Sequence, residues 1–461
     1  MRLRTSLFKF FYTVVFNVLV ISQGYSASLQ QGLSAFNQND YKEAKEILEP
    51  LALQGDAKAQ FTLAEMYSLG KGVEKDLKEE FSWIKMASEG GYVEAQFTLG
   101  SMYQLGVSTA KDNQKAAIWY RKAAKQGHAK SQSNLGLMYL AGDGVNKDYT
   151  QALSWFKKAA DQGHAKSMNS IGVIYTNGYG VDRDYDMAAD WFKKAAKLGN
   201  VKSYNNLGIK YFVGKGVPKD VEKAILWYRK AANKGNVDAQ FMLGDIHDRG
   251  KNIFQNYKKA RLWYRLAALQ GDAEAQFRLG MLQYNGQGTP KNNKKAIEWF
   301  QKSAKQGFAK SQNALGYRYY NGLGVNKDIQ KAIEWYRKAA EQDYSQSQHS
   351  LGNKYFYGEG VDKDEKKGVE WYLKSAKQNY SLAQHSLGIA YVKGKGVEKD
   401  YAKAVEWLRK ASDQGNVNSQ FTLGAIYYNG GFGIKINHYL GDKYYSMSCE
   451  GGYKKACFED D

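Results

Sequence analysis

The stretch NVKSYNNLGIKYFVGKGVPKDVEKAILWYRKAANKG, Asn200–Gly235, decides the fold. Its pattern recurs every 36 residues in eleven copies. The copies begin at Asp56, Tyr92, His128, His164, Asn200, Asn236, Asp272, Phe308, Tyr344, Tyr380 and Asn416. All ten Trp of the chain occupy one position of this unit, from Trp83 to Trp407. A fixed period of this length indicates a repeat architecture in which each unit buries its apolar face against its neighbours.

Each unit has the signals of two helices. Apolar residues at three- and four-residue spacing predict a first helix over Val201–Val213. Gly214 follows, and its position is Gly in all eleven copies, as is typical of a left-handed residue that ends a helix. The position of Asp220 is Asp or Asn in every copy, which is typical of an N-cap. The second helix therefore begins after Asp220 and ends at Gly235, whose counterparts are Gly, Asp or Asn.

A further glycine recurs inside the first helix. The position of Gly208 is Gly in ten copies and Ala once, at Ala64. Glycine inside a helix costs about 0.5–1 kcal/mol relative to Ala, so its repetition predicts a close helix approach. We expect this glycine to make room for the neighbouring Trp, which can bury about 150–250 Å².

Over all copies the pattern is A-x-[AS]-Q-x-x-L-G-x-x-Y-x-x-G-x-G-V-x-K-D-x-x-K-A-x-x-W-[YF]-x-K-A-A-x-Q-G. This pattern resembles the Sel-1-like repeat, a relative of the tetratricopeptide repeat, over Asp56–Gly452. The resemblance implies an all-α fold, an α/α superhelical solenoid of eleven 36-residue repeats. It also implies an adaptor that binds proteins, often in a bacterial envelope, and it implies no reaction.

The first 26 residues have the plan of a secretory signal peptide. Arg2, Arg4 and Lys9 precede an apolar run from Phe10 to Ile21, and small residues follow, so we expect cleavage after Ser26. The run is shorter than the roughly 20 residues that span a bilayer. An uncleaved N-terminal anchor is the alternative. Later segments hold no comparable run, so we expect no integral membrane span after cleavage.

The remaining boundaries follow from the repeat frame. Residues 27–55 depart from the 36-residue pattern and have the order of a plain tetratricopeptide helix pair, which predicts an N-terminal cap. The eleven repeats occupy residues 56–452 without an intervening linker. Residues 453–461 are interpreted as a C-terminal capping tail.

The two Cys of the chain lie at the C-terminal end, Cys449 in the last copy and Cys457 in the capping tail. Their positions in the repeat match those bridged in cysteine-rich Sel-1-like proteins of gastric bacteria. That resemblance, an even Cys count and a signal peptide predict a disulfide, with two free thiols as the alternative. Two Cys alone are too few for a metal site.

The chain is basic, with 66 Lys and Arg against 46 Asp and Glu, a formal net charge of +20. Most of the excess repeats on the second helix, as in Arg229 and Lys230, where a solvated outer face explains it. The alternative is an acidic partner such as an anionic lipid surface, a glycan or an acidic protein. Export and the lack of a nucleic-acid motif argue against nucleic acid.

Enzyme chemistry has little support. The Gly-x-Gly loops follow helices and recur in most copies, so they are interpreted as turns and not as phosphate sites. Ser82 with Lys85 and Ser154 with Lys157 match S-x-x-K, but neither S-D-N nor K-T-G accompanies them. The cysteine-rich relatives are described as penicillin-binding or weakly β-lactam-hydrolysing, which keeps that alternative open. No cofactor is expected.

A variable stripe on the first helix is the candidate partner-binding groove. The sixth, tenth and thirteenth residues of each unit vary most and share one helix face. In copies eight to ten the stripe reads Asn313, Tyr317, Tyr320, His349, Asn353, Phe356, His385, Ile389 and Val392. Aromatic and amide side chains suit a protein or glycan contact. Inter-repeat packing is the alternative, and two His on adjacent helices are too few for a metal.

These observations predict an exported, non-enzymatic scaffold of the bacterial envelope that binds a protein partner in this groove. A secreted or surface virulence factor that binds a host glycoprotein or immunoglobulin is the second interpretation. The third is the penicillin-binding or weak β-lactamase-like protein. Exported here means periplasmic, secreted or surface-exposed.

Overall fold

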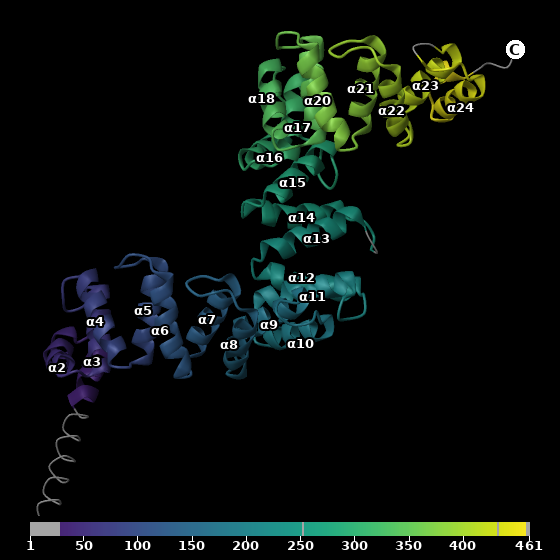
Figure 1. Ribbon diagram of the computed structural model, residues 1–461. Coiled ribbons are helices and arrows are strands. Elements are labelled where there is room, and N and C mark those ends of the chain that lie inside the picture. The colour runs from purple at the N-terminus through teal and green to yellow at the C-terminus, as the bar shows by residue number, and fades with distance from the viewer. Residues whose placement is uncertain (1–27, 251–252, 431–432, 458–461) are drawn as a thin grey trace, which may run out of the picture. The chain divides into compact units, whose positions relative to one another are not determined.

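The computed structural model describes residues 28–250, 253–430 and 433–457. The fold is all-α, as predicted, and consists of antiparallel helix pairs that follow one another along the chain (Figure 1). The helices form two compact units, one ending at Lys234 and the other beginning at Gly235. The predicted signal peptide lies outside the described residues.

The first unit opens with a helix over residues 28–37, within the predicted N-terminal cap. Its other helices are α2 (Tyr41–Leu53), α3 (Ala57–Leu69), α4 (Leu77–Glu89), α5 (Val93–Leu105), α6 (Asn113–Lys125), α7 (Ala129–Ala141), α8 (Tyr149–Asp161), α9 (Ala165–Asn177), α10 (Tyr185–Lys197), α11 (Val201–Val213) and α12 (Val221–Asn233). From α3 onward the odd-numbered helices are the first helices of the repeats and the even-numbered helices are the second helices.

The second unit continues the same alternation. Its helices are α13 (Val237–Arg249), α14 (Tyr257–Leu269), α15 (Ala273–Asn285), α16 (Asn293–Lys305), α17 (Ala309–Asn321), α18 (Ile329–Ala340), α19 (Ser345–Tyr357), α20 (Glu365–Lys377), α21 (Ser381–Lys393), α22 (Tyr401–Ser412), α23 (Val417–Asn429), α24 (His438–Glu450) and the 3-10 helix η1 (Lys454–Ala456).

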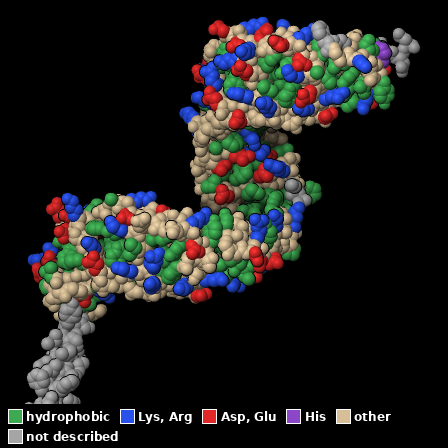
Figure 2. Space-filling view, viewed as in Figure 1, with side chains coloured by type: hydrophobic (Ala, Val, Ile, Leu, Met, Phe, Trp, Pro, Cys, Tyr) green, Lys and Arg blue, Asp and Glu red, His purple; other side chains and the backbone are tan. Residues whose placement is uncertain are grey.

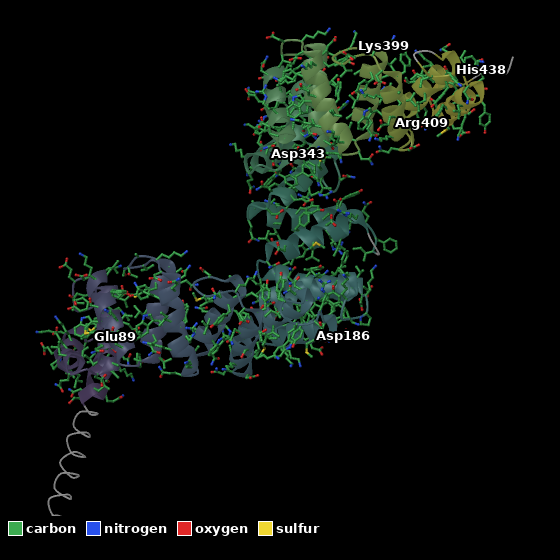
Figure 3. All side chains as sticks on the ribbon, viewed as in Figure 1. Glu89, Asp186, Asp343, Lys399, Arg409 and His438 are labelled. Atoms are coloured by element: carbon green, nitrogen blue, oxygen red, sulfur yellow. A yellow bond between two sulfur atoms is a disulfide. The ribbon has the colours of Figure 1, made fainter. Side chains whose placement is uncertain are left out.

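The predicted helix ends are confirmed. Gly214 ends α11 in the left-handed conformation, with φ 78° and ψ 45°. The Oδ1 atom of Asp220 accepts the N–H of Lys223 at 2.9 Å and caps α12. After the second helices, Asp343 and Asn379 replace Gly and still adopt φ of 59° and 63° (Asp343 is labelled in Figure 3). Local sequence therefore sets the length of every helix pair.

The expectation that the recurrent glycine makes room for Trp was wrong. A Cβ atom on Gly208 would lie 2.5 Å from Cδ1 of Tyr228, the residue after Trp227, and Tyr228 is fully buried. The Tyr or Phe that follows each Trp points at the first helix in this way in most copies. The glycine therefore admits the ring of the next residue, because adjacent positions on a helix face different directions.

Eight of the ten Trp side chains instead lie partly buried at the edge of the core, whereas Trp83 and Trp155 are buried. In Trp227 the ring is half-buried, and Nζ of Lys230 lies 4.3 Å from its centroid. The same contact, at 3.8–4.6 Å, is made by Lys122, Lys158, Lys194, Lys302, Lys338, Lys374 and Lys410. Part of the basic excess on the second helices thus covers Trp through cation–π contacts.

Paired glutamines join the two helices of most repeats. Nε2 of Gln306 donates to Oε1 of the buried Gln276 at 2.9 Å, and Nε2 of Gln276 donates to the carbonyl of Ala268 at 3.0 Å. Equivalent pairs are Gln126–Gln96, Gln162–Gln132, Gln270–Gln240, Gln342–Gln312, Gln378–Gln348 and Gln414–Gln384. Met168 and Leu198 replace both glutamines in the fourth copy.

At the C-terminal end, α24 is joined to the segment after η1. Cys449 in α24 and Cys457 form the predicted disulfide. The ring of Tyr453, between them, contacts Phe421 of α23 at 5.0 Å. The C-terminal tail is therefore held to α23 by packing and to α24 by a covalent bond.

Candidate partner-binding surfaces

Three polar residues of the predicted groove bond to the next repeat. Asn313 Oδ1 accepts the hydroxyl of Ser347 at 2.8 Å. His349 Nε2 lies 3.0 Å from Ser386 Oγ, and His385 Nδ1 lies 2.9 Å from Ser419 Oγ. These contacts run from each first helix to the first helix of the following copy, so they belong to inter-repeat packing.

Burial keeps both of these His neutral at ordinary pH. Burial, and then the neighbouring His385, lower the pKa of His349 to about 4. Burial lowers the pKa of His385 to about 4 as well. Among the described residues no group of three or more His, Cys, Asp or Glu could hold a metal ion.

The apolar members of the stripe are also packed. Phe356 is 8% exposed, and its ring lies 5.6 Å from that of Tyr372. Ile389 and Val392 are partly buried. Tyr317, Tyr320 and Asn353 of the stripe line an open cavity.

This cavity, here called the tyrosine cavity, lies between α17, α18 and α19 and has a volume of about 300 Å³. Its lining residues are Tyr317, Tyr320, Asn321, Tyr336, Ser350, Asn353, Lys354, Tyr357 and Glu359. Tyr317 and Tyr357 are 50% and 63% exposed, so two phenol rings face solvent at its rim. Asn353 Oδ1 accepts the hydroxyl of Tyr372 at 2.6 Å, which fixes the amide.

A buried cation lies beside the tyrosine cavity. Lys354 is 5% exposed, and its Nζ lies 3.4 Å from the ring centroid of Tyr320 and forms an ion pair with Glu359. The Tyr320 hydroxyl donates to the same Glu359 carboxylate at 2.9 Å. The Lys354 ammonium, which donates to this carboxylate, holds the pKa of Glu359 below its usual range. A charge-assisted network thus fixes Tyr320.

Sequence reasoning missed Lys354, although a signal was present. The equivalent position is apolar in most copies, as at Met102, Ile246 and Leu282. Lys210 and Arg318 are the other cations at this position, and both are buried. A cation at a position that is apolar in most copies therefore indicates a repeat in which the surroundings of that position differ from those in the other repeats.

A second cavity, of about 740 Å³, opens on the first-helix side of the first unit. We call it the basic groove and define it by Lys130, Leu137, His164, Lys166, Asn169 and Lys202. These residues belong to α7, α9 and α11 or precede α9 directly. None of the described residues that line it is Asp or Glu.

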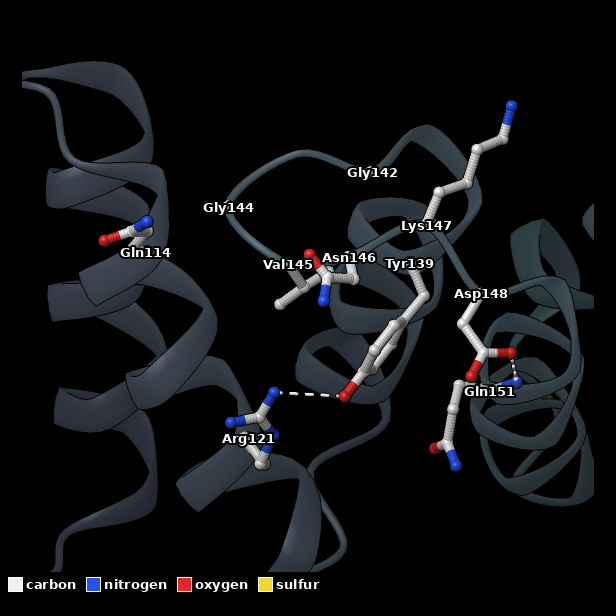
Figure 4. Close-up of a pocket in the computed structure, with 10 residues that line it drawn as sticks. All are labelled: Gln114, Arg121, Tyr139, Gly142, Gly144, Val145, Asn146, Lys147, Asp148 and Gln151. Carbon is white, nitrogen blue, oxygen red and sulfur yellow. Dashed lines mark hydrogen bonds between the residues drawn. The ribbon is translucent and has the colours of Figure 1, made fainter.

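A third cavity, of about 790 Å³, lies near α6, α8 and the loop between α7 and α8 (Figure 4). Arg121 donates to the hydroxyl of Tyr139 at 3.0 Å across it. The same contact recurs between Arg337 and Tyr355 at 3.4 Å. Because the arrangement repeats along the array, we interpret it as a structural contact between copies.

Charged side chains of both signs are interspersed on the visible face of each unit (Figure 2). Among the described helices, none combines the length and apolarity needed to cross a bilayer.

The Sel1 repeat model matches the chain in eleven consecutive segments. They are residues 57–92, 93–128, 129–164, 165–200, 201–236, 237–272, 273–308, 309–344, 345–380, 381–416 and 417–453. The chain belongs to the Sel1 repeat family. The family assignment confirms the predicted resemblance, with segment boundaries that differ by one residue from the predicted ones.

Two solved Sel1-type structures are similar to this chain. One is c5321, described as a protective antigen present in uropathogenic Escherichia coli strains, with 39% identity and a TM-score of 0.72 over 89% of this chain and 90% of its own. The other is a Sel1 repeat protein from Oxalobacter formigenes, with 31% identity and a TM-score of 0.55 over 67% of this chain and 89% of its own. None of the curated proteins compared with the chain matches it.

Proposed function

We propose that this Sel1 repeat protein is an exported, non-enzymatic scaffold that binds a protein partner at the tyrosine cavity. The tyrosine cavity carries the proposal, because Tyr317 and Tyr357 expose large aromatic surfaces beside a fixed charge network. Tyrosine is enriched among residues that dominate binding energy, since its ring buries apolar area while its hydroxyl finds a partner. The groove proposed from the sequence is thereby reduced to Tyr317, Tyr320 and Asn353.

Export is supported by three observations. The N-terminal 26 residues have the plan of a signal peptide. The Cys449–Cys457 disulfide suits an oxidising compartment. The similar protein c5321 is described as a protective antigen, and an antigen must be reachable by the immune system. This last observation favours the second candidate function, a surface or secreted protein that binds a host partner.

Site-specific photocrosslinking in cells tests the scaffold function. A photoreactive amino acid at Tyr317 or Tyr357 is expected to trap one partner reproducibly, identified by mass spectrometry. Leu262 on α14 is the matched control, because it is 54% exposed on a second helix of the same unit. Equal crosslinking from Leu262 and the two tyrosines would contradict partner binding at the tyrosine cavity.

The compartment in which the partner is found separates the two candidate functions. Capture of an envelope protein in the periplasmic fraction would support the envelope scaffold. The virulence-factor function would be supported if the Sel1 repeat protein were recovered in the medium or on the cell surface. Its crosslinks would then be to host glycoprotein or immunoglobulin only. N-terminal sequencing of the exported protein is expected to start at Ala27, and retention of the first 26 residues would contradict cleavage.

A further inference from the structure

A row of three lysines lines the basic groove. Lys130, Lys166 and Lys202 occupy the third position of three consecutive copies, and each is exposed. In the described part of the chain no ion pair joins any of the three to an acidic residue. The groove therefore presents positive charge that its own lining does not neutralise.

Helix stability does not explain these lysines. Each lies in the first turn of α7, α9 or α11, where the helix dipole favours acidic side chains and disfavours cations. Three other copies follow that rule at the same position, with Glu94, Asp238 and Glu274, and two copies have Lys58 and Lys310 there. Lysine at this position thus opposes the local preference of the helix, and in copies three to five the three lysines line one groove together.

Hydrogen bonds on the floor of the groove join two of the helices that carry the lysines. Asn169 Oδ1 accepts the Ser203 hydroxyl at 2.9 Å and the Asn206 amide at 3.0 Å, so α9 and α11 are in direct contact. Packed helices lie about 8–10 Å apart, so we expect a similar spacing between successive lysines. A polyproline II segment has three residues per turn and rises about 3.1 Å per residue, so every third side chain recurs after about 9 Å on one side.

We propose that the basic groove binds an acidic, extended segment of a partner protein whose carboxylates recur at every third residue. Lys130, Lys166 and Lys202 each pair with one carboxylate. Leu137, which is 47% exposed on the floor, contacts apolar residues between the carboxylates. This site lies within the first unit and is independent of the tyrosine cavity.

Fluorescence anisotropy with two labelled peptides of identical composition tests the proposal. One peptide is three repeats of Glu-Pro-Pro, and the other has its three Glu clustered in the middle of six Pro. The periodic peptide is expected to bind the purified protein about tenfold more tightly, and to weaken as salt rises. Equal affinity for the two peptides would overturn the proposal.

Substitutions locate the binding site. Each of Lys130→Gln, Lys166→Gln and Lys202→Gln is expected to weaken the periodic peptide about two- to fivefold, as for exposed ion pairs. Lys310→Gln is the matched control, because Lys310 is exposed at the same repeat position in the second unit. An unchanged affinity in the triple variant, or binding of phosphatidylserine vesicles without binding of the peptide, would overturn the proposal.

His164 supplies a readout that does not depend on the lysine variants. Its Nδ1 lies 2.9 Å from Ser167 Oγ and its ring lines the groove. Burial, and then Lys166 and Lys130, lower its pKa. Carboxylates bound to these lysines are expected to raise the pKa of His164, as followed by NMR titration. Peptide binding without this change would place the ligand elsewhere and overturn the proposal.

Failure here is distinguishable from failure of the proposed function. With the photoreactive amino acid moved to Asn321, which also lines the tyrosine cavity, Tyr317→Ala with Tyr357→Ala is expected to abolish crosslinking and to leave the affinity for the periodic peptide unchanged. The triple lysine variant is expected to do the reverse.

Discussion

At the scale of single residues, the recurrent glycine and the ring that follows Trp form one packing unit. A Cβ atom on Gly316 would lie 2.7 Å from Cδ1 of Tyr336, which is 4% exposed. The one copy with Ala at this position, Ala64, has Ile84 where the others mostly have a ring. In that copy the larger Ala64 thus accompanies the smaller Ile84, because the two positions fill the same volume.

Gly316→Ala is expected to destabilise the second unit by about 1–2 kcal/mol, since overpacking outweighs the gain in helix propensity. In a Tyr336→Ile background, which reproduces the Ala64 and Ile84 pair, the same substitution is expected to be neutral or stabilising. Thermal unfolding followed by circular dichroism measures the four variants of this cycle. A Gly316→Ala cost that is the same in both backgrounds would show that the ring is not the cause.

His349 occupies a position that is Phe in other copies. Its ring lies 5.6 Å from those of Tyr372 and Tyr380. Phe277 has nearly the same surroundings, with Phe300 and Phe308 at 5.8 and 5.7 Å. The sequence alone suggested a groove residue, whereas the structure assigns His349 to packing.

His349 is expected to make stability depend on pH. Its folded pKa of about 4 lies below the ordinary value of 6.5, so the unfolded chain binds the proton first as the pH falls. Stability is therefore unaffected above about pH 7 and decreases by up to about 3 kcal/mol between pH 6.5 and pH 4. His349→Phe is expected to retain the fold and reduce this decrease in thermal unfolding, with the part from His385 remaining. An unchanged pH profile would contradict a buried neutral His349.

At the scale of helices, the glutamine pairs join the second helix of a repeat to its first. They were not predicted, although both Gln positions are visible in the repeat pattern. In the first and last copies the second Gln is absent, and Oε1 of Gln60 and Gln420 has no partner among the described atoms. The glutamine pairs are therefore found in copies that have a neighbouring copy on both sides.

Gln306→Leu is expected to cost about 1–3 kcal/mol, because it leaves the buried Oε1 of Gln276 without a donor. Adding Gln276→Met reproduces the Met168 and Leu198 pair of the fourth copy and is expected to recover most of that loss. The carbonyl of Ala268 keeps the N–H of Gly271, at 3.1 Å, in the double variant. Urea unfolding compares the variants, and a double variant less stable than Gln306→Leu would contradict this account.

At the scale of the whole molecule, each repeat contacts mainly its neighbours, so perturbations are expected to remain local. The C-terminal copy has a neighbour on one side and is closed by the Cys449–Cys457 disulfide. The two Cys are eight residues apart in the sequence. In the chain-entropy model, closing a loop of that length stabilises the folded state by about 2–3 kcal/mol.

Replacement of both Cys by Ser is expected to raise hydrogen exchange in α24 and, to a lesser extent, in α23. Exchange in α13 and α14, at the other end of the same unit, is expected to stay unchanged. Mass spectrometry of exchanged peptides measures both regions in one experiment. A uniform rise throughout the second unit would show that the unit unfolds as one cooperative block.

The sequence by itself determined the helix pairs, their ends and the family, because caps and apolar spacing act within one unit and recur eleven times. The disulfide was also predicted, from the resemblance to cysteine-rich Sel-1-like proteins, the even number of Cys and the expected export. Tertiary structure decided which ring meets the glycine, which glutamines pair and which stripe residues remain open. These depend on contacts between helices, where a polar residue such as Asn313 can bond the next copy or face a ligand with the same sequence signature. Asn313 is bonded to the next copy, whereas Tyr317 is exposed to solvent. The position of the neighbouring helix decides this difference.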